Sequence, residues 1–203
     1  MANLNAPRGL VPSRYANGSA WNGATNLYYI ASTDLNAMYP GDPVITAAVT
    51  DGVGTMGITK ATVGTETLRG VIVGFAIANP NATSFQGVNL DLSLQSIPAT
   101  KTTAYYALVV DDPDVIFEVQ DDGTSVIAVT SMGKNASLTI AAPTAPVQNS
   151  ATTLLNSSVN TTQALNLRLM GAVQRANNDP TLVNAKWLVK INQHELMGNT
   201  AGI

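Results

Sequence analysis

The segment Val115-Ile116-Phe117-Glu118-Val119-Gln120, followed by Asp121-Asp122-Gly123, decides the fold class of this chain. Its odd-numbered positions are apolar, whereas Glu118 and Gln120 fall on even-numbered ones. Because successive side chains of a strand point to opposite faces, this alternation predicts a half-buried antiparallel strand. Asp-Asp-Gly is a turn sequence, so we predict that it joins this strand to a second one as a hairpin.

Sequence patterns typical of strands also occur on both sides of this segment. In Lys186–Ile191 the two lysines share a face with Leu188, while Trp187, Val189 and Ile191 share the other. β-rich runs separated by turn residues recur about every ten residues, which is typical of sandwiches and barrels. We predict strands at 27–31, 43–50, 56–62, 70–78, 88–94, 104–110, 115–120, 125–130, 138–142, 165–170 and 185–192. The chain is therefore predicted to be all-β, an antiparallel β-sandwich of the jelly-roll kind.

Residues 1–25 have a different composition. They are rich in Pro and Gly, show no helical or strand period, and carry only positive charges. Aromatic and aliphatic side chains are unusual in a linker, so we predict an extended N-terminal arm that docks on a partner, against the alternative of a frayed terminus. The predicted contact residues are Arg8, Leu10, Arg14, Tyr15 and Trp21.

Residues 26–203 then form the predicted sandwich domain. Within it, residues 143–163 are uncharged and rich in Thr, Ser and Asn. We predict a long polar excursion there that packs on a neighbouring subunit, with a mobile surface loop as an equal alternative.

Charge is scarce in this chain. Charged residues make up 11% of its 203 residues, against about 25% in an average soluble domain. An exterior that is polar but uncharged suits extensive protein contacts, because burying an amide or hydroxyl costs less than burying an ion. The net charge of -3 argues against nucleic-acid and membrane-surface binding, since both need a basic footprint. The absence of cysteine fits assembly in a reducing cytosol. We find no signal peptide and no membrane span.

Three motifs invite a chemical interpretation. Gly52–Gly57 matches the GxGxxG pattern, but the β-branched residues after it predict a strand where a dinucleotide site needs a helix. Residues 111–122 hold six carboxylates, which favour turns over a Ca²⁺ site or a glycosidase pair; cation binding stays open. The single histidine, His194, is predicted to lie at the surface or an interface. We therefore predict no catalytic residue, no metal, no cofactor and no enzymatic activity.

The opening of the chain resembles a known group of proteins. Ala6-Pro7-Arg8-Gly9-Leu10-Val11-Pro12, Tyr15–Ala24, Tyr28-Tyr29-Ile30 and Gly41-Asp42-Pro43-Val44 are similar to the start of tailed-bacteriophage capsid decoration (cement) proteins. Trp187–Asn192 resembles the same group more loosely. The resemblance implies a sandwich or jelly roll, commonly a homotrimer, that binds the major capsid protein on the capsid exterior and has no catalytic residues.

We therefore expect a structural virion protein, made in the cytoplasm of a bacterial host, that stabilises contacts between major capsid protein subunits. Its expected partners are the major capsid protein and itself, with no nucleic acid and no membrane. Two alternatives remain: a phage fibre or spike protein, and a glycan-binding or carbohydrate-active sandwich that depends on the 111–122 carboxylates.

Overall fold

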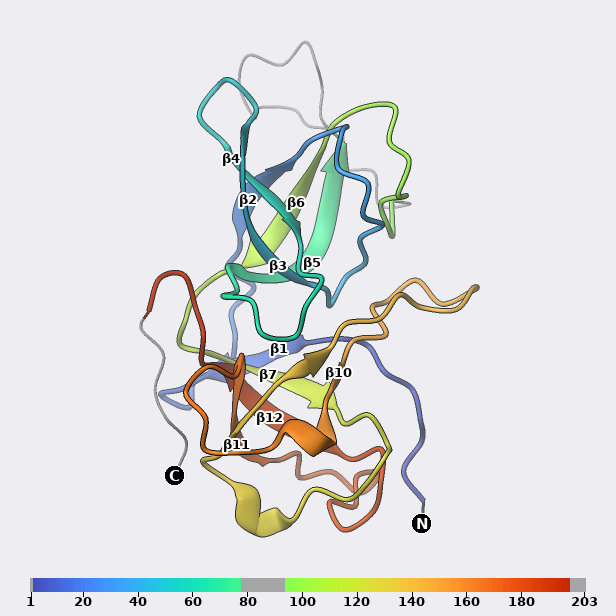
Figure 1. The fold of residues 1–203 in the computed structure, drawn as a ribbon, viewed down its shortest axis with the longest axis vertical. Coiled ribbons are helices and arrows are strands. Elements are labelled where there is room, and N and C mark those ends of the chain that lie inside the picture. Colours follow the sequence, from blue (N-terminus) through green and yellow to red (C-terminus); the bar gives the residue numbers. More distant parts are fainter. Residues whose placement is uncertain (1, 78–93, 198–203) are drawn as a thin grey trace.

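The computed structural model describes residues 2–77 and 94–197, which form two β-bodies, one above the other in Figure 1. The strands are β1 (Val11–Tyr15), β2 (Asn26–Ile30), β3 (Pro43–Thr50), β4 (Met56–Lys60), β5 (Gly70–Ile77), β6 (Tyr105–Val110), β7 (Val115–Gln120), β8 (Asn135–Ala136), β9 (Leu138–Thr139), β10 (Thr153–Leu154), β11 (Leu167–Ala172) and β12 (Lys186–Ile191). Two 3-10 turns, η1 (Val129–Ser131) and η2 (Asn156–Ser158), are the helical elements of the described residues.

The upper body is a closed barrel in the order β2-β4-β3-β5-β6, and the lower body is a five-stranded sheet in the order β1-β7-β12-β11-β8. The chain begins in the sheet, leaves it after β1 to build the barrel, and returns as β7. There β7 pairs antiparallel with β1, with Val11 opposite Glu118 and Tyr15 opposite Val115. The barrel is thus inserted between two neighbouring strands of one sheet.

Each body has its own apolar core. The barrel core includes Ile30, Val44 and Ile72. The lower core is centred on Trp187 and Phe117. The two-stranded pair β9–β10 contributes Leu138 and Leu154 to the lower core, so it faces the five-stranded sheet as the second layer of a small sandwich. Ala61, Leu68, Val71 and Val110, from the barrel and the segments beside it, also belong to the lower core. Apolar packing therefore joins the two bodies.

The all-β prediction is confirmed, and antiparallel pairing dominates; among the described strands only β2 and β4 pair in parallel. A jelly-roll order is not confirmed by either body. The alternation in Lys186–Ile191 is also confirmed, since Trp187, Val189 and Ile191 are buried and the residues between them are half-buried. The predicted strand at 88–94 lies almost wholly outside the described residues.

Two strand predictions differ from the structure. The predicted hairpin at Asp121–Gly123 is wrong, because β7 pairs with β1 and β12 instead. The predicted strand at 125–130 is likewise wrong, since this stretch runs into η1. The side chain of Asp121 holds distant backbone groups of residues 184 and 185, so the turn serves a long-range contact in place of a hairpin.

Part of the predicted N-terminal arm is an ordered strand. Leu10 is 1% exposed in the lower core, and its N–H donates to Gly41 O at 3.0 Å. Upstream, Asn3 hydrogen-bonds the backbone of Asp179 in both directions, at 2.8 Å each way. Residues 3–15 are therefore held on the body of their own chain.

The excursion at 143–163 starts as a projecting finger, seen in orange at the right of Figure 1. Residues 144–148 are exposed, including Val147. At its base Ser150 is fully buried, and its N–H donates to Pro40 O at 2.9 Å. The second half of the predicted excursion returns to the sheet body as β10 and η2.

Candidate functional site

The face of the five-stranded sheet that points away from its core gathers most of the basic residues; we call it the outer face. Cross-strand partners share a face of a sheet. In the first row Arg14 lies opposite Ile116, Ile116 opposite Lys190, and Lys190 opposite Arg168. Strands lie about 4.8 Å apart, so these three cations follow one line of roughly 15 Å across four strands.

The next rows of the outer face mix apolar and charged residues. Val11 lies opposite Glu118, which in turn lies opposite Leu188, and Gln120 lies opposite Lys186. Val11 is 39% exposed and Leu188 is half-buried. Apolar side chains therefore separate the first row of cations from Lys186.

A hollow of about 250 Å³ opens on these rows, and three cations line it. Lys186 comes from β12, Arg8 from the segment before β1, and Arg175 from the loop between β11 and β12. Arg175 forms an ion pair with Glu118. Within the described residues neither Arg8 nor Lys186 has an ion-pair partner, so two side-chain charges of the hollow are uncompensated by direct contact.

A second hollow of about 240 Å³ adjoins the first and shares Arg8 and Val11 with it. Its other lining residues are chiefly apolar: Leu10, Pro12, Trp21, Pro40, Gly41, Ile72, Val73 and the polar Asn149. Trp21 packs half-buried against the lower core. A basic hollow and an apolar hollow thus meet at the edge strand β1.

The outer face contrasts with the rest of the molecule. Six of the ten Lys and Arg residues lie on or beside it: Arg8, Arg14, Arg168, Arg175, Lys186 and Lys190. Three carboxylates accompany them: Glu118 paired with Arg175, Asp114 paired with Lys190 at 2.7 Å, and Asp179 in a hollow that Lys186 also lines. Six minus three leaves an excess of three positive charges on a chain of net charge -3.

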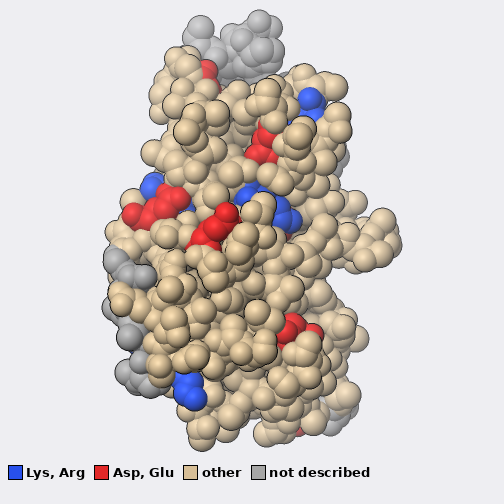
Figure 2. Space-filling view, viewed as in Figure 1, with Lys and Arg blue, Asp and Glu red and all other residues tan. Residues whose placement is uncertain are grey.

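The cations of the barrel are instead committed to internal ion pairs. Lys60 pairs with Asp42 at 2.9 Å, Arg69 with Asp111 at 3.3 Å, and Lys101 with Asp34 at 3.4 Å. The view in Figure 2 accordingly shows a surface that is mostly uncharged, with small isolated groups of charge. Accessible positive charge is thus concentrated on one side of the sheet body.

The predicted contact residues separate into two groups. Arg8 and Arg14 are exposed, on the outer face. Leu10 is 1% exposed in the lower core, so it offers a partner almost no surface. Tyr15 and Trp21 pack against the core of their own chain, and the Tyr15 hydroxyl donates to Asn22 Oδ1 at 2.8 Å. Packing against the chain's own core therefore accounts for Leu10 and for part of the Tyr15 and Trp21 side chains.

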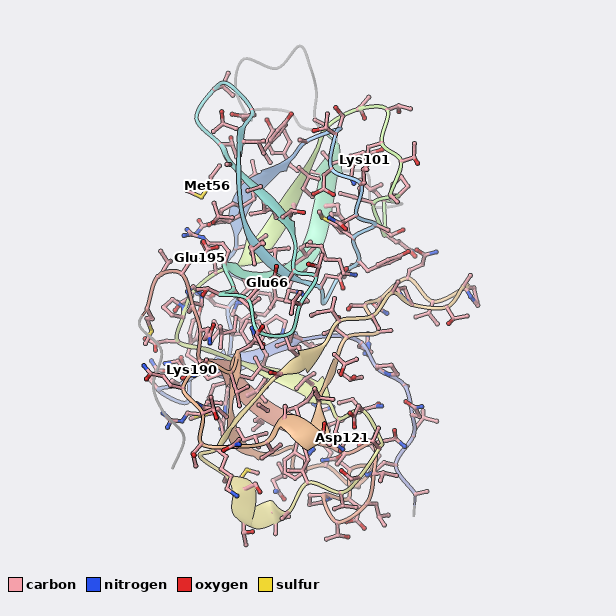
Figure 3. All side chains as sticks on the ribbon, in the orientation of Figure 1. Met56, Glu66, Lys101, Asp121, Lys190 and Glu195 are labelled. Atoms are coloured by element: carbon pink, nitrogen blue, oxygen red, sulfur yellow. The ribbon has the colours of Figure 1, made fainter. Side chains whose placement is uncertain are left out.

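The carboxylates of 111–122 do not converge on one point. Asp111 accepts hydrogen bonds from Asn26, Tyr28 and Arg69. Asp121 is buried in the lower body, where Figure 3 labels it, and accepts a hydrogen bond from Trp187, whereas Asp114 and Glu118 form separate ion pairs. Across the described residues no group of three or more His, Cys, Asp or Glu side chains could hold a metal ion.

The first part of the glycine motif, residues 52–55, lies in the β3–β4 turn, and Met56 and Gly57 begin β4, which is the strand predicted after the glycines. Gly52 and Gly54 have φ of +78° and +109°. Asp51 Oδ1 accepts the N–H groups of Val53 and Thr55 at 2.9 Å each. These contacts close a hairpin between antiparallel strands.

His194 lies inside the chain, at the junction of the two bodies, so the prediction that it lies at the surface or an interface is wrong. It is 1% exposed and bridges to Leu68, just before β5. Burial lowers its pKa, and the positive charge of Arg69 adds to this effect. His194 Nδ1 accepts the N–H of Leu196 at 3.0 Å, which places the proton of the neutral ring on Nε2.

The neighbour of His194 ties the C-terminal segment to the barrel. Glu195 accepts the Thr46 N–H at 2.8 Å and also the Thr46 hydroxyl, and in Figure 3 it lies where the two bodies meet. Arg69 donates to the Tyr28 hydroxyl at 2.7 Å, and that hydroxyl donates to Asp111 at 2.5 Å. Burial, with the Asp111 contact, raises the pKa of Tyr28 to about 12. Hydrogen bonds between polar and charged side chains therefore add to the apolar packing where the two bodies meet.

Sequence reasoning missed Arg168, Arg175, Lys186 and Lys190 as members of a common site. The shared face of Lys186 and Lys190 was readable from alternation alone. Their proximity to Arg8 and Arg14 depends on the pairing of β1 with β7, more than a hundred positions away, and no local pattern encodes it.

Comparison with protein-family models, with curated proteins and with solved structures finds no match. The described residues contain no helix long and apolar enough to cross a membrane.

Proposed function

We propose that this chain is a structural virion protein that binds the outer surface of a tailed-phage capsid and stabilises contacts between major capsid protein subunits. The observation that carries the proposal is the one-sided surface: accessible cations concentrate on the outer face, and the exterior elsewhere is polar and charge-poor. Such a surface favours one docking orientation on a large protein lattice, because the remaining sides offer few charges to compete.

Two of the segments that resemble decoration proteins meet in the fold, which supports the proposal. Residues 6–12 and 41–44 meet where a Cβ on Gly41 would lie 2.2 Å from Arg8 O. Trp187–Asn192, the looser match, overlaps β12, which pairs with β7 beside β1. These parts of the resemblance therefore lie next to the outer face, whereas Tyr28-Tyr29-Ile30 belongs to strand β2 of the barrel.

A decoration protein gains stability on a capsid by engaging several subunits at once. Many weak contacts then act at high effective concentration, so release becomes slow although each contact is modest. We propose a homotrimer as the assembled form, and analytical ultracentrifugation of the purified protein measures it directly.

Reconstitution tests the function. The purified protein is added to expanded capsids that lack it, and binding is followed by co-sedimentation and by the temperature at which the capsids open. We expect saturable binding and a higher opening temperature. Absence of both would overturn the proposal, and trimers without capsid affinity would favour a fibre or spike protein.

A further inference from the structure

We infer that the outer face is the docking face, and that it takes a protein segment carrying an acidic side chain next to an apolar one. This inference rests on the proposed function in one respect only: the proposed function identifies the partner as the outer surface of the capsid subunit. The acidic side chain would enter the basic hollow, and the apolar one would enter the adjoining hollow beside Trp21.

The basic hollow fits a carboxylate. Arg8, Arg175 and Lys186 converge on a space of about 250 Å³, and Glu118 neutralises Arg175. The hollow therefore keeps two charges without an ion-pair partner among the described residues. A guanidinium binds a carboxylate through paired N–H donors, which makes Arg8 the better anchor of the two.

The adjoining hollow fits an apolar side chain. Its accessible lining comes from the half-buried Pro12, Val73 and Trp21, the buried Leu10 and Ile72 complete it, and it meets the basic hollow at Arg8 and Val11. A partner residue that fills it removes apolar surface from water on both sides. An aromatic wall beside an arginine is the composition that protein interfaces favour at their centres.

A protein partner fits the outer face better than a nucleic acid. Val11 and Leu188 interrupt the cations, and two half-buried rings, those of Tyr15 and Trp21, are too few to form a row of stacking platforms for successive bases. An excess of three positive charges is small against the phosphate contacts that a nucleic-acid site needs. A protein partner can instead place an acidic side chain in the basic hollow and an apolar side chain in the adjoining one.

The first test is a charge reversal in the full chain. Arg8→Glu combined with Lys186→Glu reverses both uncompensated cations of the hollow and breaks no ion pair between described residues. Lys134→Glu is the matched control, since Lys134 precedes β8 and lines neither hollow. Unchanged circular dichroism and unfolding midpoints show that each variant folds.

On expanded capsids we expect the double variant to bind about tenfold or more weakly at ~0.1 M salt, with a smaller difference at ~0.5 M, where screening is stronger. Lys134→Glu should bind like the wild type. Equal binding by the double variant and the control would overturn the docking face while leaving the proposed function intact.

A second measurement separates the two proposals. Poly-glutamate and a single-stranded oligonucleotide are titrated into the protein, and tryptophan fluorescence is recorded; Trp21 lines the apolar hollow, whereas Trp187 is fully buried. Poly-glutamate binding that is lost in the double variant supports the face even if capsids are not bound. Stronger binding of the oligonucleotide would overturn the acidic protein partner.

Discussion

Trp187 and Asp121 are joined by a hydrogen bond inside the lower core: the indole Nε1–H donates to Asp121 Oδ2 at 3.2 Å, and neither residue is exposed. The same carboxylate accepts the backbone N–H groups of Gly123, Asn184 and Ala185 at 2.9, 2.8 and 3.0 Å. Four donors thus converge on one buried side chain, which fixes the loop before β12 against the end of β7.

Replacing Asp121 is therefore expected to be strongly destabilising. Asp121→Ala leaves four donors without an acceptor, and we expect the free energy of unfolding to fall by about 3–5 kcal/mol. Asp121→Asn keeps one acceptor oxygen and should lose less. Urea unfolding followed by tryptophan fluorescence and circular dichroism measures both. Asp122→Ala is the control: this half-buried side chain accepts mainly from Thr124, and we expect a loss of about 1 kcal/mol. An equal loss for the two alanine variants would contradict the assignment.

Of the ion pairs of the barrel, Lys60–Asp42 is suited to a double-mutant cycle. Lys60 Nζ lies 2.9 Å from Asp42 Oδ2, with side-chain exposures of 9% and 0%. Burial raises the pKa of Asp42, and the Lys60 charge opposes that rise. Lys60→Met removes the compensation, and we expect a loss of about 3–5 kcal/mol. The double variant Asp42→Asn with Lys60→Met should be more stable than Lys60→Met alone, because no charge is then stranded. Additive losses in urea unfolding would show that the pair is not coupled.

Strands with a clear alternation were predictable from the sequence. Lys186–Ile191 and Val115–Gln120 each carry enough alternating residues to fix the element and, for the former, the buried face. Strand β1 was missed because it is short, contains Pro12, and has a bulge between Pro12 and Arg14. Strands β8 and β10 span two residues each, too few to show a period.

The candidate site was predictable only in part. Arg8 and Arg14 could be predicted as contact residues, because two cations close together in sequence are unusual in a chain with so few charged residues. Leu10 was assigned to a partner because the hydrophobicity of a side chain indicates that it is covered but not which part of the structure covers it; Trp21 is covered only in part by its own chain. His194 was placed at the surface for a related reason: nothing near it in sequence indicates that Leu68 and Arg69 would enclose it.

A close backbone contact between Gly41 and the Arg8–Gly9 segment holds the N-terminal segment to the barrel. Gly41 has φ of +92°, and a Cβ there would lie 2.2 Å from Arg8 O. Gly41→Ala therefore combines backbone strain with a clash against backbone, and we expect a loss of about 2–4 kcal/mol. Gly54→Ala is a matched control, with φ of +109° and nothing within 4 Å of the added Cβ; we expect about 1 kcal/mol.

Limited proteolysis adds a local measurement for the same pair of variants. If Gly41→Ala releases the segment, cleavage before β1 should become faster in that variant and stay unchanged in Gly54→Ala. Equal cleavage and equal stability would contradict the role of this contact.

The pH dependence of stability should report on His194, the single histidine of the chain. Burial and Arg69 lower its folded-state pKa, whereas Asp111, Glu195 and Asp112 act in the opposite direction with smaller effect. The unfolded chain then binds more protons than the folded one once the pH falls through about 6.5, so stability is lost on acidification by up to about 1.4 kcal/mol per pH unit. The raised pKa of Asp42 has the opposite sign, since a folded state that prefers the protonated carboxyl gains stability as pH falls through that pKa.

The difference between wild type and His194→Gln at each pH removes the Asp42 contribution, because both proteins retain it. We expect the two free energies of unfolding to converge as the pH falls from about 7.5 to about 5.5, with the wild type losing stability faster. Parallel curves over this range would mean that the His194 ring takes up a proton as readily in the folded chain as in the unfolded one, and the neutral, buried ring at the junction of the two bodies would have to be abandoned.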